Sequence, residues 1–249
     1  MRFPVPSGII GMVHLEALPG APGCSLSIQE IERLAVLDAQ TLEAGGVDAI
    51  LVENFGDVPF QKTVDPITVA AMTRIICAID ENTTIPLGVN VLRNDPAAAL
   101  AIAAATGASF IRVNVHVGAM VTDQGLIEGQ AAETLRTRES LGSEVAILAD
   151  VGVKHATPFD GAWTLEQEAK DAWHRGLADG LILSGAGTGA PTKIADIERL
   201  QSILPDTPIL IGSGHRGEAT SAHAAIVGTA FKSEGRIDLA RVRTLCSRV

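Results

Sequence analysis

Near its carboxyl terminus the chain reads Pro208-Ile-Leu-Ile-Gly-Ser-Gly214, then a short polar segment, and then Ala224-Ala-Ile-Val-Gly-Thr-Ala-Phe-Lys232. Each half is a short apolar run that ends in a glycine beside a hydroxyl residue, which is typical of a buried parallel strand and a tight loop. Glycine at a strand end lets the backbone approach a ligand closely, and clustered backbone N–H groups there bind anions. The two strand ends in succession therefore predict one phosphate site.

Six more pairs of a strand and a helix precede this region. The expected strands span 8–14, 49–52, 87–91, 110–115, 145–150 and 181–183. Helix starts among these pairs are marked by Ser27 with Glu30, Asp-Pro at 65–66 and at 95–96, and Thr164 with Gln167. Asp238 marks a final helix after the opening region. Between 214 and 224 there are barely the roughly ten to twelve residues that a crossover needs, so the helix there must be short or irregular.

Strands that alternate with helices predict a parallel sheet covered by helices. The 249 residues match the roughly 250 that are typical of one (β/α)₈ barrel. A doubly wound open sheet is the alternative, but no G-x-G-x-x-G follows the first strand, and polar residues end many strands instead of marking one switch point. The fold class predicted for 1–249 is therefore α/β, a single-domain (β/α)₈ TIM barrel whose last two loops form the phosphate site.

The composition limits the classes of partner. Hydrophobic residues make up 47% of the chain, and the net charge of −10 disfavours binding to nucleic acid. Cys24, Cys77 and Cys246 lie far apart in the sequence, which argues against a disulfide framework and favours a reducing cytoplasm. The apolar runs are shorter than the roughly 20 residues of a membrane span, so we expect a cytoplasmic protein without one. A homo-oligomer is compatible with these features.

Polar residues occupy the ends of the expected strands. They are His14 on the first strand, Glu53 and Asn54 after the second, Asn90 on the third, Arg112, Asn114 and His116 on the fourth, and Asp150 on the fifth. Because alternate side chains of a strand share a face, Arg112, Asn114 and His116 are expected to face the barrel axis and its mouth. All of these residues are therefore predicted to gather at one mouth.

Glu53 and Asp150 are the strongest candidates for chemistry, because buried carboxylates are costly unless they are paired or functional. They could share acid and base work, with Asn114 and His14 beside them, or hold Mg²⁺ or Mn²⁺. The cofactor is otherwise unknown. Arg112 could instead be an ion-pair partner of either carboxylate. Lys154 could form a Schiff base, although a solvated loop lysine is the commoner case.

The substrate-binding candidates are Asn54, Asn90, Arg112 and His116, and their alternative role is to bind loop backbone. The phosphate-binding candidates are Ser184 and Gly185 in one loop, Gly212, Ser213 and Gly214 in the next, and Gly228 with Thr229 in the last. Glycines at these positions also serve tight turns that bind no ligand. The clustering of three such loops favours the phosphate site.

The stretches Glu53-Asn-Phe-Gly-Asp57 and Gly212-Ser-Gly214 resemble the BtpA family, which is named after a photosystem I biogenesis protein and includes SgcQ-like proteins. Further matching segments are 11–15, 18–20, 88–95, 112–114, 125–129, 149–151, 188–189 and 227–229. The resemblance covers nearly the whole chain. It implies a ribulose-phosphate-binding type of barrel.

Together these features predict a barrel that binds a phosphorylated sugar or nucleotide-like metabolite at its carboxyl-end mouth. The leading hypothesis is an isomerase, lyase or hydrolase of that small ligand. The alternative, which the resemblance implies, is a non-catalytic assembly or regulatory factor like the photosystem protein.

Overall fold

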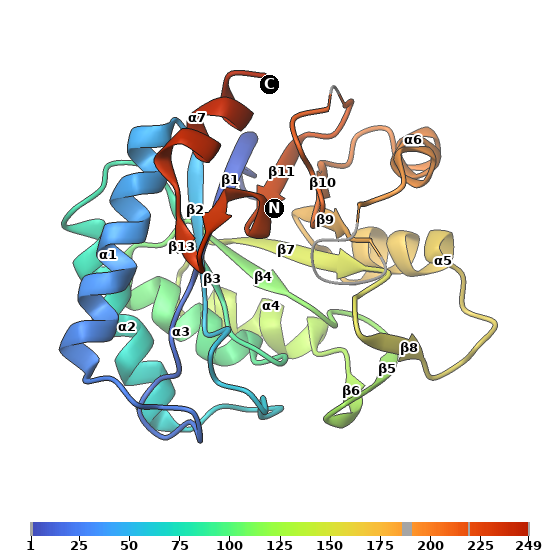
Figure 1. Cartoon of the computed structure of the whole chain (residues 1–249). Helices are drawn as coiled ribbons and strands as arrows, with labels where there is room; N and C mark the ends of the chain where they lie inside the picture. Colours follow the sequence, from blue (N-terminus) through green and yellow to red (C-terminus); the bar gives the residue numbers. More distant parts are fainter. Residues whose placement is uncertain (1, 186–190, 219, 249) are drawn as a thin grey trace.

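The computed structural model describes residues 2–185, 191–218 and 220–248. The barrel strands are β1 (Gly8–His14), β2 (Ala49–Glu53), β3 (Leu87–Asn90), β4 (Phe110–Val113), β7 (Ala146–Val151), β9 (Gly180–Leu183), β10 (Ile209–Ile211) and β11 (Ala224–Val227). They pair in parallel and close in the order β1-β11-β10-β9-β7-β4-β3-β2 (Figure 1). The predicted (β/α)₈ barrel is confirmed.

Helices cover the outside of the barrel. They are α1 (Ile28–Gly45), α2 (Pro66–Asp80), α3 (Pro96–Thr106), α4 (Ala131–Ser140), α5 (Leu165–Lys170) with η1 (Asp171–Arg175), α6 (Ile194–Ile203) and α7 (Leu239–Cys246). The predicted capping box is present at Thr164 and Gln167, and the Ser27 side chain accepts a hydrogen bond from the N–H of Glu30. Within the described residues, no helix is both long and apolar enough to cross a membrane.

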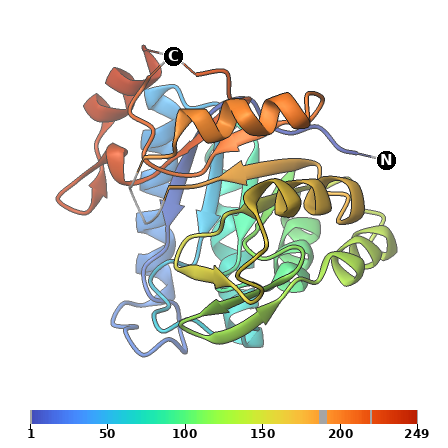
Figure 2. The same cartoon turned by 90° about the vertical axis from the view of Figure 1, so that its right-hand side faces the viewer.

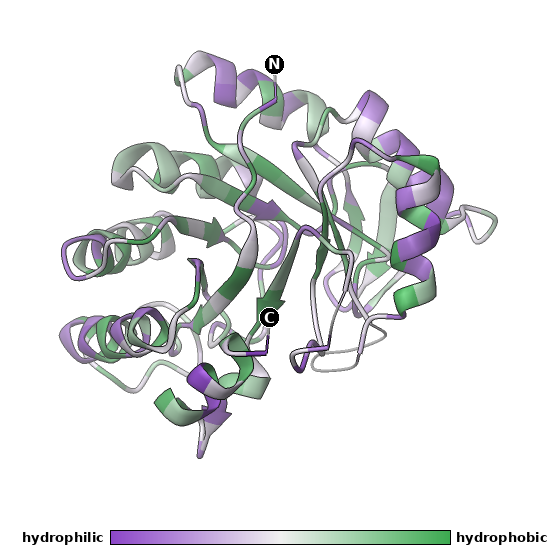
Figure 3. Ribbon diagram, turned by 90° about the horizontal axis from the view of Figure 1, so that it is seen from above, coloured by the Kyte–Doolittle hydropathy of each residue, from purple (hydrophilic) through white to green (hydrophobic). Residues whose placement is uncertain are grey.

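The alternation of side chains divides each strand between two cores. One set of residues packs under the helices, and the other fills the barrel interior with Ile10, Met12, Leu51, Phe110, Leu148, Ile182, Leu210 and Ile226. Gly88 belongs to the interior set because a Cβ there would overlap the Phe110 ring. Figure 3 shows the apolar strands at the centre and polar residues on the outer faces of the helices. The amino-terminal half of the barrel interior is therefore filled by packed apolar side chains.

The same alternation places a layer of polar side chains next to these apolar residues, toward the carboxyl ends of the strands. His14 follows Met12 by two residues on β1, Glu53 follows Leu51 on β2, and Asp150 follows Leu148 on β7. Because side chains two apart on a strand share a face, these polar groups face the interior at the carboxyl end of the barrel.

Two small sheets were not predicted from the sequence, and the largest error in an expected strand boundary is at β4. The loops after β4 and β7 pair as a three-stranded antiparallel sheet of β5 (Ala119–Thr122), β6 (Gly125–Glu128) and β8 (Ala156–Pro158), which lies at one side of the mouth (Figure 2). Strands β12 (Lys232–Ser233) and β13 (Arg236–Ile237) form a hairpin before α7. Strand β4 ends at Val113, not at 115. The described residues between β10 and β11 contain no helix, which agrees with the short crossover expected there.

Candidate functional site

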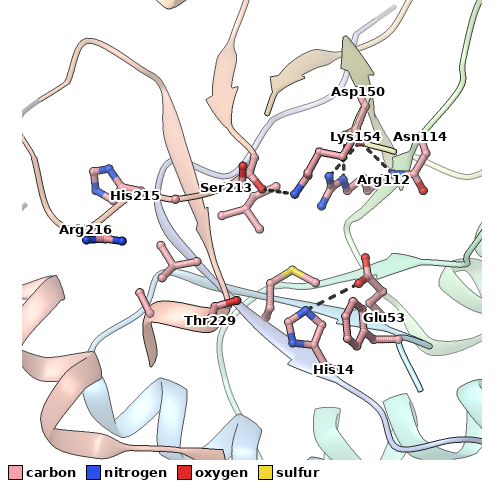
Figure 4. A pocket seen from close by; sticks show the side chains of 18 of the residues that line it. His14, Glu53, Arg112, Asn114, Asp150, Lys154, Ser213, His215, Arg216 and Thr229 are labelled. Atoms are coloured by element: carbon pink, nitrogen blue, oxygen red, sulfur yellow. Dashed lines mark hydrogen bonds and ion pairs between the residues drawn. The ribbon is translucent and has the colours of Figure 1, made fainter. Parts of the chain in front are cut away.

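A cavity of about 660 Å³ opens at the carboxyl ends of the barrel strands. Residues of the loops and strand ends of β1, β2, β4, β7, β10 and β11 line it, together with one face of α7. Figure 4 shows Glu53 and His14 opposite Arg112, Asn114, Asp150 and Lys154, with Ser213, His215, Arg216 and Thr229 farther along. The cavity therefore has two ends with different chemistry.

Glu53 lies at the first end and is buried. Its Oε2 accepts a hydrogen bond from Asn90 Nδ2 at 2.5 Å, so Asn90 positions Glu53 and is not part of the cavity wall. Burial raises the pKa of Glu53, against the opposing effects of the Arg112 guanidinium and the Asn90 hydrogen bond. A carboxyl group of raised pKa that faces a cavity is suited to carry a proton.

His14 lies beside Glu53, with its Nε2 3.7 Å from Glu53 Oε1. Burial, with smaller effects of Lys232, Arg112 and Lys154, lowers the pKa of His14 to about 3. The imidazole is therefore neutral near pH 7, and its contact with Glu53 is not an ion pair. Its Nδ1 is buried and has no hydrogen-bond partner within the described residues, so it can bond to a ligand.

Asp150 forms a bidentate ion pair with the buried Arg112. Arg112 Nε donates to Oδ1 at 2.8 Å and Nη2 donates to Oδ2 at 2.9 Å, while Asn114 Nδ2 donates to Oδ2 at 2.9 Å. The sequence had left open whether Arg112 pairs with a carboxylate and with which one, and in the structure its partner is Asp150. Because Asp150 is engaged by three donors, it is a fixed anchor for Arg112 and is poorly placed to act as a free base.

The arrangement does not fit the Mg²⁺ or Mn²⁺ site predicted at Glu53 and Asp150. These cations need several oxygen ligands, and in the described part of the chain no three His, Cys, Asp or Glu side chains gather as a metal site. Both Asp150 oxygens already accept hydrogen bonds, and the positive charges of Arg112 and Lys154 act on Glu53. Asp150 is therefore neutralised by Arg112, and Glu53 and Asp150 alone supply too few oxygen ligands for these cations.

Lys154 is a cavity residue and not the solvated loop lysine that was expected. Its Nζ donates to the carbonyl of Gly212 at 3.3 Å, and its own carbonyl accepts from Arg93 Nη2 at 2.7 Å. Burial, aided by Arg112, lowers the pKa of Lys154 to about 8. The chain leaves the extended conformation at Gly152, whose φ is +62°, so strand alternation does not predict where Lys154 points.

The second end of the cavity is built from the glycine-rich strand ends. Gly212, Ser213 and Gly214 follow β10, and Gly228 and Thr229 follow β11; all five line the cavity. Gly212 also has a packing role, because a Cβ there would overlap the Ser184 hydroxyl.

Ser184 and Gly185 lie behind this wall. The Gly185 N–H donates to Ser213 Oγ at 3.0 Å, and the buried Ser184 hydroxyl has no partner within the described residues. Neither residue lines the cavity. The matching segment at 188–189 lies outside the described residues.

Two predicted substrate contacts are bound elsewhere. Asn54 Oδ1 accepts from the Leu92 N–H at 2.7 Å, so this side chain holds the loop after β3. His116 Nε2 bonds to the Gly176 carbonyl at 2.8 Å. His116 does not share the cavity with Arg112 and Asn114 because β4 ends at Val113 and its alternation stops there.

Four cavity arginines were not among the predicted site residues: Arg93, Arg216, Arg241 and Arg248. Arg241 lies in α7, whose start the Asp238 cap marked, and Arg248 lies two residues beyond the end of this helix at Cys246. Arg112 and Lys154 add two more positive charges to the cavity lining. Glu53 and Asp150 are the only carboxylates among the cavity residues of the described chain. The cavity is cationic although the chain carries a net charge of −10.

The BtpA family matches this chain over residues 6–249. The photosystem I biogenesis protein BtpA of Synechocystis sp. is 47% identical over 242 residues, covering 95% of this chain and 84% of that protein. An uncharacterized protein of Thermococcus kodakarensis is 44% identical, covering 92% of this chain and 88% of its own length.

Among solved structures, phosphoribosyl anthranilate isomerase from Thermus thermophilus has a TM-score of 0.58 at 14% identity, with 97% of each chain covered. Orotidine 5′-monophosphate decarboxylase from Methanocaldococcus jannaschii has a TM-score of 0.55 at 15% identity, covering 99% of this chain and 98% of that one. At such identity the likeness shows the shared barrel fold. The sequence match shows more, and the chain belongs to the BtpA family.

Proposed function

We propose that this protein is an enzyme that binds a phosphorylated sugar or nucleotide-like metabolite and moves a proton on it with Glu53. One observation carries the proposal. A single cavity joins a glycine-rich, arginine-lined end, suited to a phosphate group, to a buried carboxyl group of raised pKa. A ligand that spans the cavity would be anchored by its phosphate and would present a C–H or O–H group to Glu53.

The phosphate would rest against the backbone of Ser213, Gly214 and Gly228, with Arg216 supplying charge. Such anchoring turns remote binding energy into correct placement of the reacting atoms. His14 and Asn114 each have a buried polar atom without a partner in the described residues, namely Nδ1 and Oδ1, and these atoms would orient ligand hydroxyl groups. The Arg112 guanidinium would stabilise negative charge that develops on the ligand.

The geometry favours an isomerase or a lyase over a hydrolase. Both reactions need one proton carrier near a carbon or oxygen atom, which Glu53 supplies. Hydrolysis needs a base that activates water, and Asp150 is bound by Arg112 and Asn114. The two structural neighbours described above are enzymes of phosphorylated small molecules by their names, which accords with this choice.

The test combines binding with turnover. Isothermal titration with inorganic phosphate and a panel of sugar phosphates identifies the ligands, and NMR of each mixture detects isomerisation or elimination. We expect phosphate to compete with the sugar phosphates and Glu53→Gln to abolish turnover while phosphate still binds. Binding of sugar phosphates no tighter than that of their unphosphorylated sugars would overturn the proposal.

A second candidate is an assembly or regulatory factor that binds the metabolite without converting it. The 47% identity to the photosystem I biogenesis protein supports this alternative. The same screen separates the two candidates. Tight binding of a sugar phosphate with no turnover by the wild-type protein would favour the regulatory factor.

A further inference from the structure

We propose that Lys154 is a nucleophile that forms a Schiff base with the carbonyl carbon of a phosphorylated aldehyde or ketone. This inference rests on the proposed function and narrows its substrate class. It assigns the carbonyl group of the ligand to Lys154 and the proton transfers to Glu53.

The position of Lys154 sets it apart from the other lysines. The chain has five: Lys62, Lys154, Lys170, Lys193 and Lys232. Lys62, Lys170 and Lys193 are exposed, and of the five only Lys154 is among the residues that line the cavity. A carbonyl compound held in the cavity can therefore meet one lysine side chain.

The surroundings of the amine leave it available for reaction. Its Nζ donates to the Gly212 carbonyl at 3.3 Å, and within the described residues no carboxylate forms an ion pair with it. The main chain of Lys154 is held by Arg93, which donates to the carbonyl at 2.7 Å. The backbone of this lysine is thus held, while among the described residues its amine donates to one neutral acceptor, the Gly212 carbonyl.

Electrostatics favour the reactive form of this amine. A lysine attacks a carbonyl only as the neutral amine, and burial next to a second cation is a known way to produce it. Lys154 is partly buried beside Arg112, and its pKa is lowered to about 8, so a substantial fraction is neutral near pH 8. The exposed lysines have no such environment.

The chemistry balances without a further reactant. The lone pair of Nζ attacks the carbonyl carbon, a C–N bond forms, and the carbonyl oxygen becomes a hydroxyl group after proton transfer from nitrogen. Loss of that hydroxyl as water, with a proton supplied by Glu53, leaves a protonated imine. The imine then withdraws electrons from the neighbouring carbon, so that a C–H or C–C bond there can break.

The neighbourhood of Lys154 also limits the ligand length. Its amine contacts Gly212, and the next two residues, Ser213 and Gly214, form part of the proposed phosphate wall. Adjacent Cα atoms are about 3.8 Å apart, so the carbonyl carbon and the phosphate would be separated by only a few bonds. Short sugar phosphates meet this requirement.

Reductive trapping tests the inference. The protein is incubated with sodium cyanoborohydride and either D-glyceraldehyde 3-phosphate or D-glyceraldehyde, and adducts are located by intact mass and peptide mapping. We expect one adduct at Lys154, formed at least about tenfold faster with the phosphorylated probe. Lys154→Met should remove this adduct, whereas the control Lys170→Met should not.

A measurement on the wild type keeps the test valid if Lys154→Met does not fold. The rate of trapping at Lys154 should rise with pH to a midpoint near 8, in accord with the lowered pKa, well below the roughly 10.4 of a lysine side chain in a model peptide. A midpoint like that of the exposed lysines would overturn the role of Lys154.

The outcomes separate this inference from the proposed function. Adducts spread evenly over the lysines, with inorganic phosphate still binding, would overturn the Schiff base and leave the phosphate proposal standing. A Lys154 adduct that forms equally fast with both probes would support the nucleophile and contradict the phosphate anchor.

Discussion

The two ends of the cavity are built by different means. The end at β10 and β11 is mostly main chain, because the segments 212–214 and 228–229 line the cavity there, with Arg216 near them (Figure 4). The end at β2 and β7 is made of side chains that hold one another, as Asn90 holds Glu53 and Arg112 holds Asp150. Single side-chain changes should therefore weaken ligand binding at the glycine-rich end and disable or destabilise the Glu53 end.

The largest effect is expected from Glu53→Gln. If Glu53 is the proton carrier, kcat should fall by roughly 10²–10⁴-fold, because that is the usual contribution of general acid–base catalysis. The affinity for inorganic phosphate should stay within about twofold, since the phosphate end is untouched. Steady-state kinetics and isothermal titration measure the two quantities, and the exposed Glu133→Gln is the matched control. Unchanged turnover in Glu53→Gln would contradict the assignment of proton transfer to the Glu53 end and of phosphate binding to the glycine-rich end.

The next largest effect concerns the buried Arg112–Asp150 pair, which lies at the Glu53 end of the cavity. Arg112→Met leaves the Asp150 carboxylate uncompensated, which should lower the free energy of unfolding by about 3–5 kcal/mol. Urea denaturation measures the loss.

The double variant Arg112→Met/Asp150→Leu sharpens this test. Replacement of a whole buried ion pair by apolar residues is often close to neutral, so the double variant should recover much of the lost stability. If the double variant is no more stable than Arg112→Met, the ion pair does not explain the loss.

At the phosphate end the corresponding change should affect binding and not stability. Arg216→Gln should weaken phosphate binding by roughly 10-fold or more, since a hydrogen bond to a charged group contributes about 1.5–3 kcal/mol. Arg216 is exposed, so unfolding should shift by no more than about 0.5 kcal/mol. Isothermal titration checks the affinity, with the exposed Arg175→Gln as control. An equal loss of affinity in both variants would show only a general effect of charge.

The smallest effect is expected from Glu168, which supports the turn after β7. Glu168 Oε2 accepts from the Gly152 N–H at 3.1 Å, and burial raises the pKa of this carboxyl to about 7 from 4.5. The folded state therefore holds this proton more tightly than the unfolded state. The stability gained is fully present below about pH 4.5 and is lost as the pH rises through about 7.

Glu168→Gln removes this dependence on pH. Relative to the wild type, the variant should gain on the order of 1 kcal/mol or more between pH 4 and pH 8. Urea denaturation at both pH values measures the difference. Parallel stability curves for the two proteins would contradict the raised pKa.

Much of the barrel was predictable because its signals are local. The apolar runs, the caps at Ser27 and Thr164, and the glycines that end helices each act within a few residues. Strand alternation also predicted which polar side chains face the barrel interior, since Glu53, Arg112 and Asp150 each follow an apolar interior residue by two positions on the same strand. The antiparallel sheet of β5, β6 and β8 was missed because it joins loops that are far apart in the sequence.

The sequence by itself determined the eight barrel strands, most of the helices between them, the glycine-rich ends of β10 and β11, and the placing of carboxylates at strand ends, because each depends on spacing within one segment. The tertiary structure alone decided that Arg112 neutralises Asp150, that His116 turns to Gly176, and that Lys154 enters the cavity. It also brought Arg241 of α7, and Arg248 just beyond this helix, to the cavity. These placements depend on where a strand stops, on the backbone turn at Gly152 and on packing between distant segments, and no local pattern in the chain encodes them.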